Sequence, residues 1–463
     1  MPWRPGWALL AVLACSTSTA PTGGRDQGGT GGSDEEPGPV TGGGGGGGGG
    51  GSGGGTGGQQ KPDAAMVPDA AMVPDAAAVP DAGADAAAPD VRTDPPRDGP
   101  PGPSVFKHPG VLVDRRALDF IKAKVAAGAE PWKSAVAKAK GSRFGTLAYA
   151  PTPFPVVECG PYSNPSTGCG EEQRDAIASY THALLWYLTG DAAHAKKSIE
   201  IMNAWSAVLK DHTNHNAPLQ SAWVASVFPR AAEIIRYTYD GWSPGDVARF
   251  AAMLRDVYLP KVIKGSGGNG NWELSMAEAT MGIGVFLDDR ATFDAAVALW
   301  KRRVPAYIYL ESDGPQPIPP PAGNKDLISL WYGQDKFVSG LGQETCRDYG
   351  HLTGGFAALV NAAETAHVQG VDLFGMEAKR IAAGFEFNAQ YLDGVSIPAW
   401  LCKGALKLQT NDTWEIGYNA LANRLGMAMP HTQAVVAKIR PTGANHHMVW
   451  ETLTHAQLDA VAR

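Results

Sequence analysis

The stretch "EEQRDAIASYTHALLWYLTGD", residues 171–191, is the clearest guide to the fold. Its large apolar residues recur every three or four positions, which is the spacing of one face of an α-helix, and Gly190 ends the run. These apolar residues are Ile177, Tyr180, Leu184 and Leu188. The next stretch, "AAHAKKSIEIMNAWSAVLK", repeats the pattern. The two stretches therefore predict a helical hairpin with a tight turn.

Further hairpins follow along the chain. Residues 221–263, 271–308 and 347–392 each contain two helical runs, whereas the apolar–polar alternation of strands is nearly absent. A fixed-period repeat, which is typical of an open solenoid, is also missing. The sequence therefore predicts an all-α domain of about twelve helices, arranged as an (α/α) toroid of about six hairpins.

The N-terminus has the pattern of an export signal. Residues 1–15 contain Arg4, an apolar run and then Cys15, and they are too short to remain as a membrane span. The end of this segment, "VLAC", resembles the lipobox of bacterial lipoproteins, which implies lipidation of Cys15. The alternative is a soluble secreted protein cut near Ala20. We expect an outer-membrane or cell-surface lipoprotein, or otherwise a periplasmic or secreted protein.

Residues 16–104 consist mainly of glycine, proline, alanine and aspartate, which cannot bury enough apolar surface to fold. We expect a disordered tether that leads to one large domain at residues 105–463. The tether carries a net charge of −8, Arg4 adds +1, and the domain itself is neutral, which gives the chain's net charge of −7. A neutral domain argues against nucleic acid as a partner. An acidic polymer would have to be held by a local site.

Four cysteines remain after the signal segment. Cys159 and Cys169 flank a short loop and are candidates for a local disulfide in an oxidising compartment, and Cys346 with Cys402 could form a second. No pair has the spacing of a metal site, so we expect no metal. The sequence leaves the connectivity open.

Proton-transfer chemistry is concentrated in "GQETCRDYGH", residues 342–351. In a helix that starts near residue 345, Arg347 and His351 would share a face. Glu344 lies one turn earlier and is a candidate substrate contact. Asp348 is more simply a first-turn acid that stabilises the helix. Tyr349 is equally suited to the core and to a site.

A second candidate region is "GSGGNGNWELS", residues 265–275. Asn271 is either a helix cap or a ligand for substrate, and Trp272 is either core or a plane on which a sugar ring packs. Weaker candidates for substrate binding lie at the starts of other predicted helices. They are Gln220, Trp223, Trp414, Tyr418, Asn419 and Arg424.

Four blocks in this order, "NWELSMAEATMGIGVFL", "ETCRDYGHLTGGFAALVNAAETAHVQGVDLFG", "WEIGYNALANRLGM" and "ETLTH", resemble the alginate lyase superfamily of polysaccharide lyases. The resemblance implies an (α/α) toroid and β-elimination on a uronic-acid polysaccharide without metal or other cofactor. Alginate is the first expectation for the substrate and glucuronan the second. We expect a monomer.

The resemblance also implies a catalytic set. Asn271 matches the family's carboxylate-neutralising asparagine, Arg347 and His351 match its "RD.GH" block, and Tyr418 is our choice for its tyrosine. Two departures leave the base open between Tyr418, Tyr349 and His351: Trp272 stands where some members have histidine, and Tyr349 where many have glutamine.

Two other functions remain open at this point. A glycoside hydrolase on the same scaffold would need two opposed carboxylates, for which Glu344, Asp348 and Glu415 are available. A non-catalytic, surface-anchored sugar-binding protein would need none.

Overall fold

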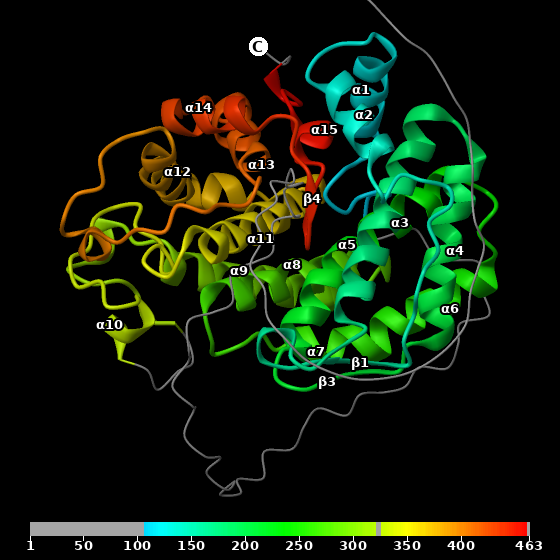
Figure 1. Ribbon diagram of the computed structural model, residues 1–463, viewed down its shortest axis with the longest axis horizontal. Helices are drawn as coiled ribbons and strands as arrows, with labels where there is room; N and C mark the ends of the chain where they lie inside the picture. Colours follow the sequence, from blue (N-terminus) through cyan, green and yellow to red (C-terminus); the bar gives the residue numbers. More distant parts are fainter. Residues whose placement is uncertain (1–105, 321–325, 461–463) are drawn as a thin grey trace, which may run out of the picture. The chain divides into compact units, whose positions relative to one another are not determined.

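A computed structural model describes residues 106–320 and 326–460 of the 463-residue chain (Figure 1). The predicted signal segment, Cys15 and the tether at residues 16–104 lie outside these residues. The regular structure within them is predominantly helical, which confirms the predicted all-α class.

The hairpin predicted at residues 171–210 consists of α3 (Cys169–Thr189) and α4 (Ala192–Val208), which pack against each other. Gly190 follows α3 with a φ of 74°, a conformation that glycine adopts without strain. The carboxylate of Asp191 then accepts a hydrogen bond from the backbone N–H of Ala193 and caps α4. The turn therefore lies where the sequence predicts it.

The later hairpins follow the same plan. In chain order their helices are α5 (Ala217–Thr238), α6 (Pro244–Met253), α7 (Leu259–Val262), α8 (Gly270–Phe286), α9 (Arg290–Tyr307), α11 (Tyr349–Val368) and α12 (Leu373–Leu392). α8 packs against α9 and α11 against α12, while a π-helical turn connects α6 to α7.

Helices α3, α5, α8 and α11 pack side by side in that order and form most of an inner ring (Figure 1). Shorter helices from the two ends of the described domain close it: α1 (Arg115–Ala126), α13 (Glu415–Tyr418) and α15 (Glu451–His455). α11 contacts α13, α13 contacts α15, α15 contacts α1, and α1 contacts α3. This closed circuit confirms the predicted toroid.

The remaining elements are short. They are α2 (Trp132–Gly141), α10 (Leu327–Leu330), α14 (Pro430–Ile439), β1 (Val156–Cys159), β2 (Ser166–Thr167), β3 (Asp211–Thr213), β4 (Ala444–Asn445) and β5 (Met448–Val449). β1 pairs antiparallel with β2 and parallel with β3, and β4 forms a hairpin with β5. Strands of two to four residues are too short to show alternation, so the sequence did not predict them.

The inner helices carry polar side chains as well as apolar ones. In α8 every residue except Trp272 is buried, as expected of a helix surrounded by others. Glu278 in this helix binds Arg230 of α5, accepts a hydrogen bond from Asn361 of α11 at 3.1 Å and lies 2.6 Å from the ring of His447. A buried network therefore joins α5, α8 and α11 to the turn between β4 and β5.

The structure contains both predicted disulfides, Cys159–Cys169 and Cys346–Cys402. The first ties β1 to the start of α3, and the second ties the segment before α11 to the segment after α12. Among the described residues, no helix has the length and apolar character that a membrane span requires.

Candidate active site

The main inner helices begin at the same end of the ring. Near the starts of α3 and α5, Gln173 donates a hydrogen bond to Gln220 at 2.6 Å. Between the starts of α5 and α8, the rings of His215 and Trp272 lie 5.7 Å apart. The segment before α11 in turn contacts the first turn of α8. Helix N-termini carry partial positive charge, so this end of the ring favours an anionic ligand.

The first turn of α8 is capped by side chains from a different part of the chain. Asn269 holds the cap position, but its side chain makes no capping hydrogen bond. Instead, the backbone N–H of Gly270 donates to Gln343 at 3.0 Å, and that of Asn271 donates to Glu344 at 3.2 Å. Two amides that a helix start leaves without partners are thus satisfied from the segment before α11.

Glu344 is completely buried and connects several groups. Besides the Asn271 amide it accepts a hydrogen bond from Nη1 of Arg347 at 2.9 Å and one from the hydroxyl of Tyr307 at 3.0 Å. Burial and the adjacent Glu344 raise the pKa of Tyr307 well above its ordinary value, so the phenol remains a donor. We predicted Glu344 as a substrate contact, and this is wrong because it has no exposed surface. It positions Asn271 and Arg347 around one carboxylate.

The side chains that Glu344 positions keep a small exposed surface. Asn271 is 6% exposed, and its Oδ1 has no hydrogen-bond partner among the described residues. The side chain of Arg347 is 11% exposed, and its guanidinium carbon lies 5.7 Å from the centre of the Tyr332 ring. Trp272, next to Asn271, is half-buried. These groups form one local cluster, which we call the Glu344 cluster: Asn271, Tyr307, Tyr332, Glu344 and Arg347.

His351 lies in the first turn of α11 and is held by Asp348. The helix begins at Tyr349 rather than near residue 345, with Asp348 as its cap. Arg347 therefore precedes the helix, and the predicted shared helix face with His351 is wrong. Nδ1 of His351 lies 2.7 Å from Asp348 Oδ2, which fixes the tautomer in which Nδ1 carries the proton. Burial alone would raise the pKa of Asp348, but the hydrogen bonds and charge of His351 outweigh it and leave this pKa lowered.

The tip of the β4–β5 hairpin supplies a second histidine that our sequence analysis missed (Figure 1). The ring of His446 lies 4.3 Å from that of Trp223 on α5. Burial, with the neighbouring charges of His447 and His351, lowers the pKa of His446 to about 3, so this imidazole is neutral. The adjacent histidines of "NHH", residues 445–447, were the available signal.

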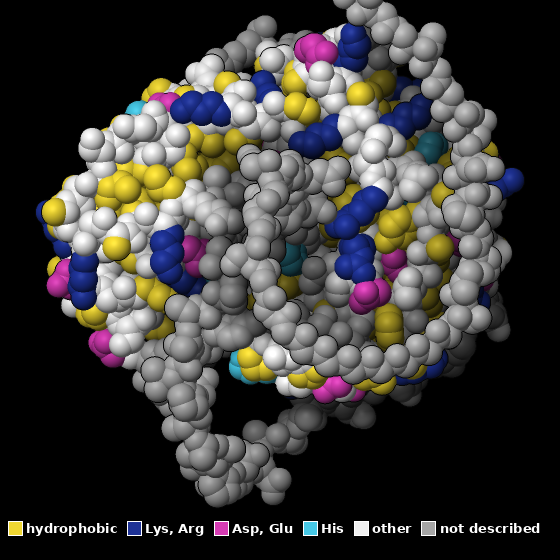
Figure 2. All heavy atoms as spheres, in the orientation of Figure 1, with side chains coloured by type: hydrophobic (Ala, Val, Ile, Leu, Met, Phe, Trp, Pro, Cys, Tyr) yellow, Lys and Arg dark blue, Asp and Glu magenta, His cyan; other side chains and the backbone are white. Residues whose placement is uncertain are grey.

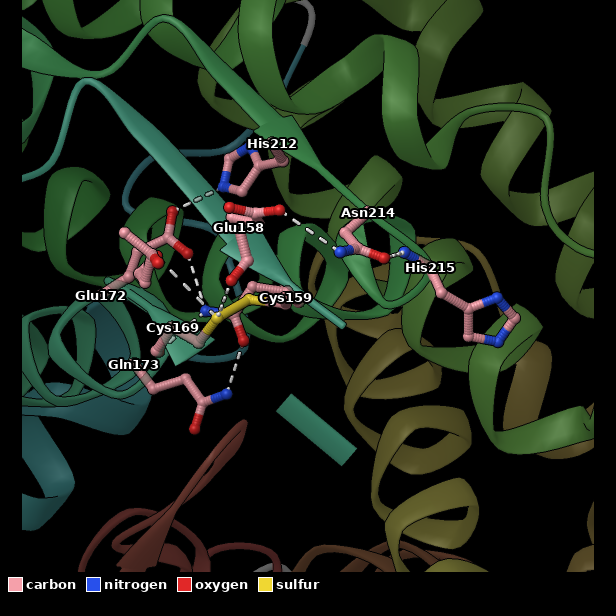
Figure 3. Close-up of a disulfide and its surroundings, with 10 residues drawn as sticks. Glu158, Cys159, Cys169, Glu172, Gln173, His212, Asn214 and His215 are labelled. Atoms are coloured by element: carbon pink, nitrogen blue, oxygen red, sulfur yellow. Dashed lines mark hydrogen bonds and ion pairs between the residues drawn. A yellow bond between two sulfur atoms is a disulfide. The ribbon is translucent and has the colours of Figure 1, made fainter. Parts of the chain in front are cut away.

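His215 is a further residue that the sequence analysis missed. Figure 3 shows it turned away from the Cys159–Cys169 disulfide, at the end of the turn after β3. Asn214 fixes this turn by donating to Glu158 at 3.3 Å and accepting from the backbone of His215 at 2.7 Å. The turn after β3 therefore holds the exposed imidazole of His215 beside Trp272.

Three other candidates are buried in the protein's own packing, which corrects our predictions for them. Tyr349 is fully buried and its hydroxyl donates to the carbonyl of Asn388. Trp414 is 1% exposed and packs edge-on against Phe385. Gln220 is also 1% exposed and is held by the network at the start of α3. A buried side chain has no surface with which to contact a polysaccharide.

The block at residues 413–427 lies in a different polar environment. Tyr418 is half-buried, and burial with the charge of Glu415 raises its pKa against the opposing effect of Arg440. Asn419 and Arg424 both bind the carboxylate of Asp459, at 2.8 and 2.9 Å. The structure therefore groups these predicted site residues with the C-terminal segment and not with the Glu344 cluster.

The three carboxylates that a hydrolase could use are all engaged in structural roles. Glu344 caps α8, Asp348 caps α11 and holds His351, and Glu415 is buried against Arg440. None of them faces another carboxylate as an acid–base pair in these contacts, which disfavours a glycoside hydrolase.

The distribution of charge on the surface is consistent with an anion-binding site that is confined to one end of the ring. On the face shown in Figure 2, the described Lys and Arg side chains are dispersed, and several lie against acidic ones. Within residues 106–320 and 326–460, no group of three or more His, Cys, Asp or Glu side chains is arranged to hold a metal ion.

The chain folds into a closed ring of helices, and Glu344 holds Asn271 and Arg347 together at the end where the inner helices begin. The alginate lyase family model matches residues 166–318, and the solved structures with this fold include alginate lyases. The family match covers part of the chain, and together with the shared fold it supports the resemblance to the alginate lyase superfamily that the sequence indicates. No curated protein matches the chain.

The similar structures share the fold at low identity. Alginate lyase A1-III from Sphingomonas species A1 is 15% identical, with a TM-score of 0.55 over 76% of this chain and 97% of that chain. A histidine-to-alanine variant of A1-III complexed with a tetrasaccharide has a TM-score of 0.51 at 15% identity, over 74% and 96%. A tyrosine-to-phenylalanine variant, also complexed with a tetrasaccharide, has a TM-score of 0.50 at 16% identity, over 75% and 99%.

Proposed function

We propose that this protein cleaves a uronic-acid polysaccharide by β-elimination, with alginate as the first substrate to test and glucuronan as the second. The observation that carries the proposal is the Glu344 cluster, in which one buried carboxylate holds Asn271 and Arg347 together. The alginate lyase family match and the shared toroid support it.

The first requirement of the reaction is to make the proton at C5 of the uronate more acidic. An ionised carboxylate next to C5 resists the additional negative charge, so donors must stabilise the enolate-like transition state. In this proposal the amide of Asn271 and the guanidinium of Arg347 bind the sugar carboxylate. Because they supply the compensating charge and hydrogen bonds, we propose that no metal is needed.

The second requirement is a base. His351 fits this role because Asp348 binds Nδ1 and fixes the tautomer in which Nε2 carries the lone pair. Asp348 remains ionised, as its lowered pKa indicates, and stabilises the imidazolium that forms. Tyr418, our earlier choice, is grouped with Arg440 and Glu415 instead.

The third requirement is an acid that protonates the departing glycosidic oxygen. Two groups near the site could serve, Tyr332 beside Arg347 and His446 near His351. The lowered pKa of His446 leaves it without the acidic proton of an imidazolium at neutral pH. We therefore assign the acid to Tyr332, and His446 to hydrogen bonding with the sugar.

We also propose that the protein is exported as a monomer and anchored through Cys15, with residues 16–104 as the tether. The support is the sequence pattern of the first fifteen residues. Labelling cells with a radioactive fatty acid tests the anchor: the wild type should be labelled and Cys15→Ala should not. Equal labelling of both would exclude lipidation at Cys15. Light scattering of the purified domain tests the monomer.

The activity is tested with a panel of alginate, glucuronan and chondroitin. A lyase leaves an unsaturated uronate at each new non-reducing end, which absorbs in the ultraviolet. We expect this absorbance to rise with alginate and, failing that, with glucuronan. New reducing ends without the absorbance would indicate a hydrolase, and binding without either signal would indicate a sugar-binding protein.

A further inference from the structure

Two loop segments beside Arg347 are held together as one surface. Residues 331–336 and 400–407, which we call the paired-loop surface, lie next to each other at the left of Figure 1, beyond α10 and α12. The Cys346–Cys402 disulfide, with a Cα–Cα distance of 5.0 Å, joins the second segment to the residue before Arg347. The two segments therefore keep a defined position relative to the candidate site.

A buried glutamine connects the two segments directly. Gln334 is 3% exposed. Its Oε1 accepts a hydrogen bond from the backbone N–H of Cys402 at 2.9 Å, and its Nε2 donates to the carbonyl of Lys336 at 2.7 Å. Further along, the carbonyl of Lys407 accepts from the backbone N–H of Tyr349 at 3.0 Å. This second contact places Lys407 at the start of α11, close to His351.

The paired-loop surface carries both lysines and aromatic rings. Nζ of Lys336 lies 4.8 Å from the centre of the half-buried Trp400 ring. A Cβ atom on Gly333 would lie 4.0 Å from Nζ of Lys403, so this ammonium lies over the first segment. The neighbouring Tyr332 ring is the one beside Arg347. Together the lysines place positive charge on the surface beyond Arg347 and Tyr332.

The lysines of this surface face solvent. Lys336, Lys403 and Lys407 are exposed, and among the described residues none of them pairs with a carboxylate. The two segments hold three lysines and one acid, Asp335. Ammonium groups spaced along aromatic faces match a polymer with one carboxylate on each sugar ring, because the rings pack on aromatic planes and the carboxylates pair with the cations.

We propose that the paired-loop surface binds sugar units of an acidic polysaccharide beyond the unit that is cleaved. This inference rests on the proposed lyase function. It makes the enzyme prefer long chains: a polymer contacts both this surface and the Glu344 cluster, whereas the shortest cleavable oligomer contacts only the cluster. Binding through exposed ion pairs is also weakened by salt.

The test compares three full-length proteins. They are the wild type, the variant Lys336→Ala/Lys403→Ala/Lys407→Ala, and a matched control, Lys196→Ala/Lys301→Ala/Lys379→Ala, whose exposed lysines lie on α4, α9 and α12. For the first variant we expect KM on the polymer to rise roughly fivefold, since single exposed ion pairs contribute little. Its kcat, and its kcat/KM on the shortest cleavable oligomer, should stay close to wild type. The control should match the wild type throughout.

A second variant and a binding measurement complete the design. Trp400→Ala should raise the KM for polymer in the same way, and high salt should remove the difference between the wild type and the lysine variant. Retardation in native gels cast with alginate tests the surface even without turnover, and the lysine variant should migrate faster than the control. If the lysine variant binds and cleaves the polymer like the wild type, the inference is overturned. If wild type forms no unsaturated product, the lyase proposal fails, while the gel result still decides on the surface.

Discussion

The backbone N–H of Asn271 donates to the buried carboxylate of Glu344 across 3.2 Å, and this contact joins the start of α8 to the segment that leads into α11. Because Glu344 also accepts from Arg347, one carboxylate sets the positions of the two groups proposed to bind the uronate. The positions of Asn271 and Arg347 are therefore set by hydrogen bonds within the protein, which cap α8 before any substrate binds.

Replacing Asn271 with alanine should remove the amide without disturbing the cap, because the backbone N–H remains. We expect kcat to fall by about 10²–10³-fold, the usual loss for one donor to a developing charge. The measurement is the initial rate of unsaturated product formation. Asn269→Ala is the matched control, since the Asn269 side chain makes no capping bond, and it should keep wild-type activity. An Asn271→Ala enzyme with an unchanged rate would remove Asn271 from the mechanism.

Replacing Glu344 with glutamine should loosen Arg347, because the amide keeps the shape of the side chain but loses the charge. The free energy of unfolding should fall by about 1–3 kcal/mol, as expected for a buried hydrogen-bonding group left partly unsatisfied. A double-mutant cycle with Arg347→Met should give a coupling energy above about 0.5 kcal/mol, measured by denaturant unfolding. Additive effects would show that the two side chains do not interact.

The two phenols can be separated by removing one hydroxyl at a time. Tyr332→Phe should lower kcat by about 10²-fold or more, as is typical for loss of a general acid. Tyr418→Phe should remain active, because Tyr418 lies near Arg440 and Glu415. The opposite result, an inactive Tyr418→Phe with an active Tyr332→Phe, would restore the tyrosine assigned from the family resemblance.

The two disulfides should contribute unequally to stability. In the chain-entropy model, the Cys346–Cys402 bond with its separation of 56 residues contributes about 4 kcal/mol, against about 3 kcal/mol for Cys159–Cys169 with its separation of 10. Paired Cys→Ser variants and denaturant unfolding measure the difference. A larger loss from the shorter loop would show that local packing, not loop closure, dominates.

Stability should decrease in acid because a histidine is buried in its neutral form. Burial, with the nearby His194, lowers the pKa of His182 from 6.5 to about 3. Between these values the unfolded chain holds more protons than the folded one, so the free energy of unfolding falls as the pH falls. The slope from this group is on the order of 1 kcal/mol per pH unit. His182→Gln should flatten the profile between about pH 6.5 and 3, and an unchanged slope would contradict the assignment.

Much of the fold could be predicted from sequence, because the hairpins leave a strong local signal. The run from Ile177 to Leu188, with Gly190 behind it, identifies α3 and its end without reference to the rest of the chain. The closed ring was predicted from the missing repeat period and from the family resemblance. The helices that close it could not be identified, because α13 and α15 are short and depend on contacts with α1 and α11. The strands β1–β5 were too short to leave a pattern.

The candidate site was predicted in part. Arg347 and His351 stood out because residues 342–351 combine several ionisable side chains, and Asn271 stood out because it follows a glycine-rich stretch. The burial of Tyr349 and Trp414 could not be predicted, because it follows from which neighbours pack on them. Tyr332, His215 and His446 were missed since each lies in an irregular segment or a two-residue turn, where spacing carries no information. Glu344 was identified as a candidate, but its role as a cap of α8 could not be predicted, because it depends on a contact between segments distant in the sequence.

The most direct test of the account is a crystal structure of the His351→Ala variant with a bound oligomer of alginate or glucuronan. We predict that one sugar carboxylate contacts both the Asn271 amide and the Arg347 guanidinium, and that the C5 proton of the same sugar faces position 351. An oligomer bound elsewhere on the ring, or bound here with its carboxylate turned away from Asn271 and Arg347, would contradict the proposed mechanism.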